Sequence, residues 1–309
     1  MSSIILTVSE EYEGERADRF AAEQTEGLSR SYIQGLIESG NMLVNGKQIK
    51  PGLRLKAEDE ISIEIPESIQ PEILPENIPL DIVYEDSDLI VVNKPKGMVV
   101  HPAAGHYSGT LVNALMYHCH DLSGINGVMR PGIVHRIDMD TTGLLVCAKN
   151  DLAHNHLAAQ LKEHSITRRY QAICLGSFKA FEGSIDAPIG RSANDRKIMA
   201  VNARNGRDAL THYKVISQNS GKAYIECRLE TGRTHQIRVH LKSIGHPLLG
   251  DLVYGGKQAE YKLHGEPLKG QTLHAMVLGF IHPGNGRYME FDSELPGYFK
   301  ELLEKFSLS

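Results

Sequence analysis

The chain has 309 residues, 41% of them hydrophobic, enough to bury one large core or one large and one small core. No apolar run approaches the ~20 residues that span a bilayer, and the N-terminus lacks the basic start and long apolar stretch of a signal peptide. We therefore expect neither a membrane protein nor a secreted one. The four cysteines have no C-x-x-C spacing, which argues against a zinc ribbon or a disulfide framework and favours a reducing cytoplasm.

The formal net charge of −5 is unusual for a protein that binds nucleic acid, but the charge is unevenly distributed. Residues 1–66 hold 7 Lys and Arg against 12 Asp and Glu, whereas residues 162–242 hold 15 basic and 7 acidic residues. A local basic excess can attract phosphates whatever the charge of the whole chain. Ordinary solvated faces would give the same counts, so charge alone leaves RNA binding open.

A small α+β unit is predicted up to residue 66. A helix opens near Arg16, and a second helix over 29–37 carries apolar residues at i, i+3 and i+4, which give it one apolar face. Asn45-Gly46 is the strongest short signal for a β-hairpin turn. Alternating residues over 61–65 predict a further strand, so two short helices are expected to accompany a small sheet.

Residues 67–79 are predicted to be a linker, because their prolines favour extended backbone and build no core. From residue 80 to 309 we expect a larger domain. It begins with strands over 80–84 and 89–93 and then alternates strands and helices without a regular period. Evenly spaced βαβ units are not found, which favours a mixed, mostly antiparallel sheet with helices around it.

Three polar segments of the larger domain indicate chemistry. The first, residues 132–146, places Asp138 beside Arg136 and His135 in a loop that positions side chains rather than building a core. The second, residues 168–173, is a basic pair that leads into a strand. The third, residues 231–240, contains two arginines, two histidines and a glutamine. Because buried charge is costly unless it is paired, this third segment is predicted to form the wall of a cleft.

These segments resemble the RluA/RluD family of pseudouridine synthases. Residues 135–143 are similar to the family signature H-R-L-D-x-x-T-S/T-G, with Ile137 and Thr142 as mild departures. Residues 232–240 match G-R-x-H-Q-I/L-R-V-H. Shorter motifs at 93–97, 188–191 and 273–275 follow in the expected order, and residues 15–65 resemble an S4 RNA-binding module. The resemblance implies an α+β protein with an S4-like domain at 1–66 and a catalytic domain at 80–309.

The resemblance also implies the activity, which is the isomerisation of uridine to pseudouridine in RNA, most closely as in enzymes of large-subunit ribosomal RNA. Asp138 aligns with the nucleophile, and Tyr170 aligns with the tyrosine that stacks on the target base and accepts its C5 proton. Arg238 aligns with the arginine that pairs with the aspartate. Arg136 is similar to the residue that fills the gap left by the flipped-out base.

The chemistry agrees with these roles. The reaction breaks the N1–C1′ bond, rotates the uracil and rebuilds the bond through C5, so nothing is oxidised or consumed and no cofactor or metal is expected. A neighbouring guanidinium favours the ionised carboxylate and fixes its direction. Attack of Asp138 on C1′ and removal of the 2′ proton to give a glycal both remain open.

RNA is the expected partner, either ribosomal RNA alone or a pre-ribosomal large subunit, and we expect a cytoplasmic monomer. The predicted RNA contacts in the catalytic domain are His135, Arg136, Arg168, Arg169, Arg191 and Arg233. Those in the S4-like module are Arg16, Arg19, Arg30 and Lys47.

Four alternatives stay open. Transfer RNA could be the substrate, because specificity is read through RNA shape. The protein could be a non-catalytic RNA-binding or ribosome-assembly factor. Asp138 and Asp140 could be turn residues or the carboxylate pair of a glycosidase. His135, His235 and His240 could bind a metal, although hydrogen-bonded histidines are the more common case.

Overall fold

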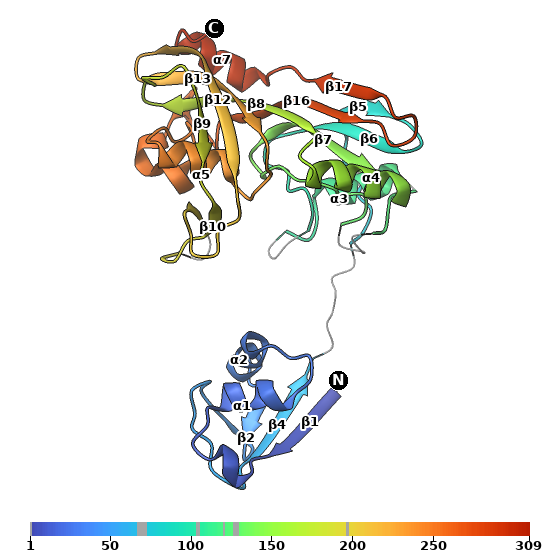
Figure 1. Cartoon of the computed structure of the whole chain (residues 1–309), viewed down its shortest axis with the longest axis vertical. Coiled ribbons are helices and arrows are strands. Elements are labelled where there is room, and N and C mark those ends of the chain that lie inside the picture. The colour runs from blue at the N-terminus through green and yellow to red at the C-terminus, as the bar shows by residue number, and fades with distance from the viewer. Residues whose placement is uncertain (1, 67–72, 103–105, 120, 126–129, 196–197) are drawn as a thin grey trace. The chain divides into compact units, whose positions relative to one another are not determined.

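The computed structural model describes residues 2–66, 73–102, 106–119, 121–125, 130–195 and 198–309. The chain divides into two compact units, Met1–Pro71 and Glu72–Ser309 (Figure 1). The first part of the predicted linker over 67–79, residues 67–72, lies outside the described residues. The prediction that it builds no core is wrong at Ile73, whose side chain is 3% exposed in the main core of the larger unit. Prolines restrain their own backbone but do not prevent an apolar neighbour from packing.

The smaller unit is built from two helices and a four-stranded sheet. Its elements are β1 (Ser2–Thr7), the 3-10 helix η1 (Glu10–Tyr12), α1 (Ala17–Gln24), α2 (Arg30–Glu38), β2 (Met42–Val44), β3 (Lys47–Gln48) and β4 (Glu60–Ile65). The strands are antiparallel in the order β1-β4-β2-β3. Ile33, Leu36 and Ile37 of α2 pack with Ile61 and Ile63, the inward residues of β4. The predicted second helix, hairpin and final strand are thus confirmed.

A buried carboxylate organises the helices of this unit. Asp18 is fully buried, with Arg16 Nε 3.0 Å from its Oδ1 and Arg30 Nη2 3.1 Å from its Oδ2. Hydrogen bonds from Arg16, then from Gln34 and Arg30, hold the pKa of Asp18 well below its ordinary value although burial opposes them. These two arginines therefore stabilise the fold of the unit, because a buried charge must be paired.

The larger unit contains one long sheet with short hairpins beside it. Its helices are α3 (Leu111–His118), α4 (Asp151–Lys162), α5 (Gln236–Ser243), α6 (Leu252–Gly255), the 3-10 helix η2 (Gly256–Ala259) and α7 (Gly297–Lys305). Its strands are β5 (Ile82–Glu85), β6 (Leu89–Lys94), β7 (Thr142–Ala148), β8 (Thr167–Leu175), β9 (Glu182–Asp186), β10 (Ile189–Arg191), β11 (Met199–Val201), β12 (Leu210–Asn219), β13 (Lys222–Leu229), β14 (Lys262–Leu263), β15 (Glu266–Pro267), β16 (Leu273–Ile281) and β17 (Tyr288–Asp292).

Nine strands form the main sheet in the order β5-β6-β7-β16-β8-β13-β12-β9, with β17 also pairing with β16. Strands β7 and β16 run parallel, and the other pairs of this sheet are antiparallel within the described residues. The prediction of a mixed, mostly antiparallel sheet is confirmed.

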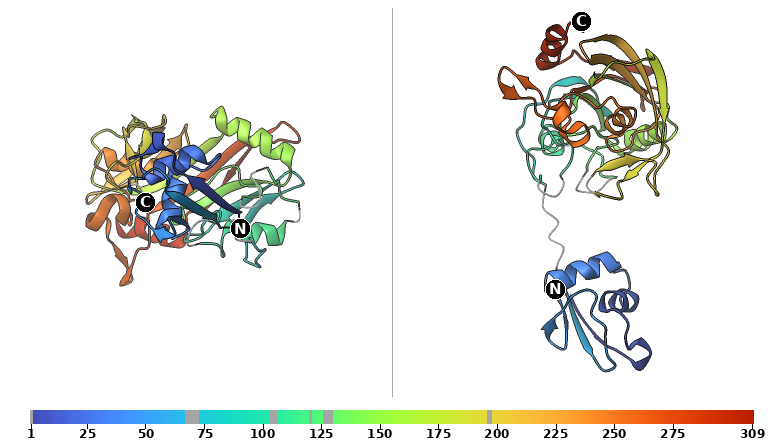
Figure 2. Two further views of the ribbon diagram at one scale, coloured as in Figure 1. Left: turned by 90° about the horizontal axis from the view of Figure 1, so that it is seen from below. Right: turned by 90° about the vertical axis from the view of Figure 1, so that its left-hand side faces the viewer.

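Helices cover both faces of this sheet (Figures 1 and 2). Successive residues of a strand point to opposite faces. Leu145 and Ala172 share one core with residues of α3 and α5. Leu144 packs instead with residues of α4, and Ile173 packs with residues of α7. The side of the sheet that carries α5 is the side that holds the candidate site described below. No helix among the described residues combines the length and the apolar content needed to cross a bilayer.

Candidate active site

A buried lysine fixes the loop that carries Asp138. Lys94 is 1% exposed, and its Nζ donates hydrogen bonds to the carbonyl oxygens of Pro95, Met98 and Met139 at 2.8, 2.9 and 2.9 Å. An ammonium has three donors, so this group is fully bonded. Burial lowers the pKa of Lys94 to about 7, against the opposing effect of nearby carboxylates. The carbonyl of Met139, next to Asp138, is thereby tied to the end of β6.

A network around Gln236 fixes the turn that precedes α5. His235 adopts the left-handed conformation, with φ of 56°, and the helix starts immediately after it. Gln236 Oε1 accepts hydrogen bonds from Thr231 Oγ1 at 2.8 Å and from the backbone N–H of Arg233 at 2.9 Å. Its Nε2 donates to the carbonyl of Leu210 at 3.0 Å. The first turn of α5, and with it Arg238, is held against β12.

Arg238 lies between two carboxylates. Its Nη1 donates to Asp138 Oδ2 at 2.9 Å, while Nε and Nη2 form a bidentate pair with Asp251 at 2.7 and 3.0 Å. Arg238 is 6% exposed and Asp251 is 1% exposed. Burial would lower the pKa of Arg238, but its hydrogen bond to Asp251 and the charge of Asp138 raise it above the ordinary value. A permanently charged, immobile guanidinium therefore orients Asp138.

The predicted catalytic residues meet in one pocket. Asp138, Tyr170 and Arg238 all line a hollow with about 630 Å³ of empty space, part of it open to solvent. The other lining residues are His135, Arg136, Ile137, Thr141, Arg168, Leu229, Gly232, Arg233, Thr234, His235, Gln236, Ile237 and Leu273. Asp138 is the only carboxylate among these lining residues, and burial raises the pKa of Tyr170. The pocket thus offers one carboxylate, an aromatic ring and a rim of cations.

The predicted RNA-binding residues of the larger unit divide into two groups. Those that line this pocket are His135, Arg136, Arg168 and Arg233. Arg169 follows Arg168 on strand β8 and therefore points to the opposite face, where it lies 3.3 Å from Glu290 and 3.9 Å from Glu226. Arg191, on β10, lines a separate hollow beside Arg204.

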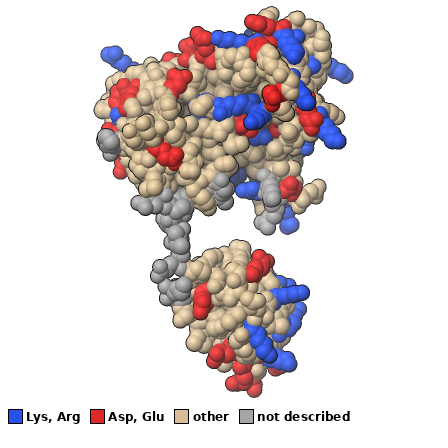
Figure 3. Space-filling view, turned by 180° about the vertical axis from the view of Figure 1, so that it is seen from behind, with Lys and Arg blue, Asp and Glu red and all other residues tan. Residues whose placement is uncertain are grey.

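The predicted RNA-binding residues of the smaller unit also differ in their surroundings. Arg16 and Arg30 pair with Asp18, and Arg19 Nε lies 3.0 Å from Glu23 Oε1. Lys47 is exposed in the hairpin of β2 and β3. Figure 3 shows several Lys and Arg side chains along one side of this unit, so a basic face is present despite the acidic total charge.

The three histidines that could bind a metal make ordinary hydrogen bonds instead. His135 Nε2 accepts from the backbone N–H of Val146 at 3.1 Å, and burial lowers the pKa of His135 to about 3. His235 Nδ1 lies 2.7 Å from the hydroxyl of Tyr254. His240 is bonded to neighbouring oxygens through both ring nitrogens. Within the described residues, none of these three belongs to a group of possible metal ligands.

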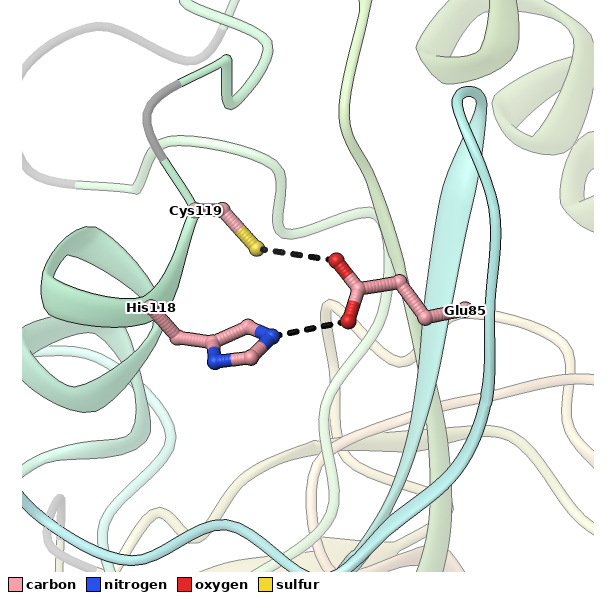
Figure 4. Close-up of side chains that lie close together, drawn as sticks. All are labelled: Glu85, His118 and Cys119. Carbon is pink, nitrogen blue, oxygen red and sulfur yellow. Dashed lines mark hydrogen bonds and ion pairs between the residues drawn. The ribbon is translucent and has the colours of Figure 1, made fainter.

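A different group lies away from the pocket, where Glu85 faces His118 and Cys119 (Figure 4). Its carboxylate oxygens lie 2.7 Å from His118 Nε2 and 4.0 Å from Cys119 Sγ. Lys149 Nζ lies 2.9 Å from the same carboxylate and already supplies a positive charge. His120, the next residue in the sequence, lies outside the described residues. The ion pair with Lys149 accounts for the carboxylate without a metal.

Asp140 does not pair with Asp138 across the pocket. It is absent from the lining residues, and its side chain lies so close to Gly270 that a Cβ there would come within 2.3 Å. Gly270 also has φ of +70°, which other residues rarely adopt. This arrangement gives no support to a glycosidase pair, which needs two carboxylates facing one substrate.

Three residues that shape the site are not among the predicted site residues, although Lys94 lies within the motif at 93–97. Asp251 orients Arg238, Lys94 anchors the Asp138 loop, and the ring of Tyr254 lies 5.0 Å from the guanidinium carbon of Arg238. Asp251 could have been noticed from its place after Gly250 and before a short helix, where its carboxylate caps the backbone N–H groups of Val253 and Tyr254.

Comparison with known proteins identifies the family to which the chain belongs. Residues 88–243 match the RNA pseudouridylate synthase family, and residues 15–61 match the S4 domain. The chain is 50% identical over 304 residues to an uncharacterized RNA pseudouridine synthase, YlyB, of Bacillus subtilis (strain 168), covering 98% of each chain. It is also 50% identical over 310 residues to ribosomal large subunit pseudouridine synthase D of Zymomonas mobilis subsp. mobilis, again covering 98% of each.

A solved structure is similar in fold. Human RNA pseudouridylate synthase domain containing 1 superimposes with a TM-score of 0.58 at 24% identity, covering 76% of this chain and 97% of that one. At this level of identity the likeness supports the fold alone, and the relatives above support the family.

Proposed function

The chain belongs to the RNA pseudouridylate synthase family, and from this premise we propose that it isomerises uridines of large-subunit ribosomal RNA, with Asp138 as nucleophile. The substrate follows the name of the Zymomonas mobilis relative, a ribosomal large subunit enzyme that is 50% identical. One observation carries the assignment of the nucleophile. Asp138 is the only carboxylate among the described residues that line the pocket, and Arg238 holds it at 2.9 Å.

Each proposed step uses a group of this pocket. Asp138 either attacks C1′ or removes the 2′ proton, and in both routes the N1–C1′ bond breaks and the uracil leaves, turns and returns through C5. Arg238 directs the carboxylate, because Asp251 fixes the guanidinium from the other side. The apolar side chains of Ile237 and Leu273 offer a surface for the detached uracil.

Tyr170 is proposed to stack on the target base and then to accept its C5 proton. The ring is buried in the pocket wall, where an aromatic can receive a flipped base. Burial raises the pKa of Tyr170, so the phenol is neutral before the base enters. Tyr170 can therefore accept the C5 proton only as a phenolate, so the phenol must first pass its own proton to water at the open side of the pocket.

Arg136 is proposed to fill the gap that the flipped base leaves in the RNA. It is exposed at the rim of the pocket, two residues before Asp138, and so can reach out of the site while Asp138 points into it. A cation at this place also neutralises phosphates next to the opened base step.

The experiment that tests the proposed function uses ribosomal RNA labelled with tritium at C5 of uracil. The label leaves to water only when C5 becomes the glycosidic carbon, so release by the wild-type protein is the expected result. Release from transfer RNA but not from ribosomal RNA would keep the reaction and change the substrate. No release from either RNA, together with tight RNA binding, would favour the binding-factor alternative and overturn the proposal.

The S4 unit is proposed to dock the RNA while the larger unit performs the reaction. We expect deletion of residues 1–66 to weaken RNA affinity by about tenfold, or about 1.4 kcal/mol, and to reduce the salt dependence of binding because phosphate contacts are lost. Filter binding at several potassium chloride concentrations measures both the RNA affinity and its salt dependence. Thermal melting of the shortened chain is the control for intact folding of the larger unit. Unchanged affinity in a folded deletion variant would contradict the docking role.

A further inference from the structure

A second hollow adjoins the catalytic pocket, and its described lining residues include several cations and no carboxylate. Its charged and polar lining residues are His101, Arg130, His135, Arg136, Lys162, His164, Arg168 and Arg233. Its empty volume is about 1090 Å³, and it shares Arg136, Arg168 and Arg233 with the catalytic pocket. On the face of the larger unit drawn in Figure 3, by contrast, basic and acidic side chains lie next to each other.

Arg168 is a buried cation that lacks an anion. It is 6% exposed, and its Nη2 donates to the carbonyl of Glu230 at 2.9 Å. Its buried Nε has no hydrogen-bond partner in the part of the chain that the structure describes. Among the described residues no carboxylate lies within ion-pair distance of it. Burial, together with the charge of Arg233, lowers the pKa of Arg168 although Tyr170 opposes them.

Arg238 shows by contrast how unusual the unpaired charge of Arg168 is. Both side chains are 6% exposed, but Arg238 has two carboxylate partners. A buried charge is costly unless an opposite charge compensates it, and removal of one partner of a buried pair is strongly destabilising. The fold therefore keeps Arg168 at a cost in stability, which is expected where the missing anion belongs to a ligand.

His101 supplies a second buried donor with no partner. It is 4% exposed, and its Nε2 lies 3.4 Å from Arg136 Nη1. A guanidinium can only donate, so Nε2 accepts and the ring proton of the neutral histidine sits on Nδ1. That Nδ1 is buried, and no described residue is its hydrogen-bond partner. Burial, with the charges of Arg136 and Arg130, lowers the pKa of His101 to about 4, so the ring is neutral at pH 7.

We propose that this hollow, hereafter the phosphate hollow, binds a phosphodiester group of the RNA backbone next to the nucleotide that enters the catalytic pocket. Arg168 and His101 provide buried donors, and the exposed Arg130 and Lys162 attract the strand at the rim. Arg136 and Arg168 line both hollows, so one RNA strand can pass directly from one hollow into the other. The inference deepens the proposed function and rests on it for the identity of the ligand.

The buried part of the hollow gives a test that does not depend on activity. Arg168→Met removes an uncompensated buried charge, so we expect the variant without RNA to melt no lower than the wild type. Inorganic phosphate at constant ionic strength should raise the melting temperature of the wild type and have no effect on this variant. A large loss of stability in Arg168→Met, with the phosphate response kept, would show that Arg168 is structural and would overturn the proposal.

The exposed rim gives a second test, on turnover. Arg130→Gln and Lys162→Gln are each expected to raise KM rather than lower kcat. Each variant should also reduce the slope of log(kcat/KM) against the logarithm of salt concentration by about 0.7–0.9, which is the change for one lost phosphate contact. Arg287→Gln, an exposed arginine that does not line the hollow, is the matched control.

The two failures are distinguishable. If the wild type isomerises uridine but the rim variants keep the salt slope and KM of the Arg287→Gln control, the phosphate hollow is refuted and the proposed function stands. If the wild type releases no tritium but phosphate still stabilises it through Arg168, the hollow stands as an anion site and the proposed function fails.

Discussion

Asp138→Asn is expected to abolish turnover, with kcat lowered by about 10⁴-fold or more, as for other enzymes that lose their nucleophile. Asparagine has nearly the same size, and its amide oxygen can still accept the hydrogen bond that Arg238 donates to Asp138. What is lost is the negative charge, and both possible routes need that charge, whether for attack on C1′ or for removal of the 2′ proton. The measurement is single-turnover release of tritium from C5 of uracil.

RNA affinity is the internal control for this variant. The cations of the pocket rim and of the phosphate hollow are untouched, so binding by Asp138→Asn should stay within a few-fold of the wild type. Asp140→Asn is the matched variant, since it removes a carboxylate two residues away that does not line the pocket. Multiple turnovers by Asp138→Asn at the wild-type rate would remove Asp138 from the chemistry.

The outline of the fold was accessible from local signals. The second helix, the Asn45-Gly46 hairpin and the buried strand over 89–93 are each specified by spacing within a few residues. The mixed character of the large sheet followed from the absence of regular βαβ units. Strand β1 was not predicted, because its place is set by pairing with β4 more than 50 residues later, as in Ile4 opposite Ile63. Such non-local pairing leaves little trace in the sequence of one strand.

The residues of the candidate site also differ in how far the sequence predicts them. Asp138 and Arg238 stand 100 residues apart, and only the resemblance to a family, not their spacing, suggested that they meet at 2.9 Å. Asp251 was given no role and Lys94 only a structural one, because the sequence does not show that a charged residue is buried until its partners are known. Arg169 is the opposite case. The alternation of side chains along a strand is itself enough to separate Arg169 from Arg168, so the sequence contained that distinction.

Loss of Arg238 should damage both stability and catalysis, and the structure allows the two effects to be separated. Arg238→Met leaves Asp251, 1% exposed, as an unpaired buried carboxylate, which should destabilise the larger unit by about 3–5 kcal/mol. It also leaves Asp138 without its hydrogen-bond donor, so turnover should be lost. Urea unfolding and single-turnover tritium release measure the two losses on the same preparation.

The double variant Arg238→Met/Asp251→Asn decides between a structural and a catalytic reading of Arg238. Asparagine removes the buried charge yet can still cap the backbone N–H groups of Val253 and Tyr254. Stability should therefore recover most of the way to the wild type. Activity should not recover, because the guanidinium that donates a hydrogen bond to Asp138 is still absent. Recovery of both would mean that Arg238 serves only to neutralise Asp251. Recovery of stability alone would mean that Arg238 also acts in the reaction, by directing Asp138.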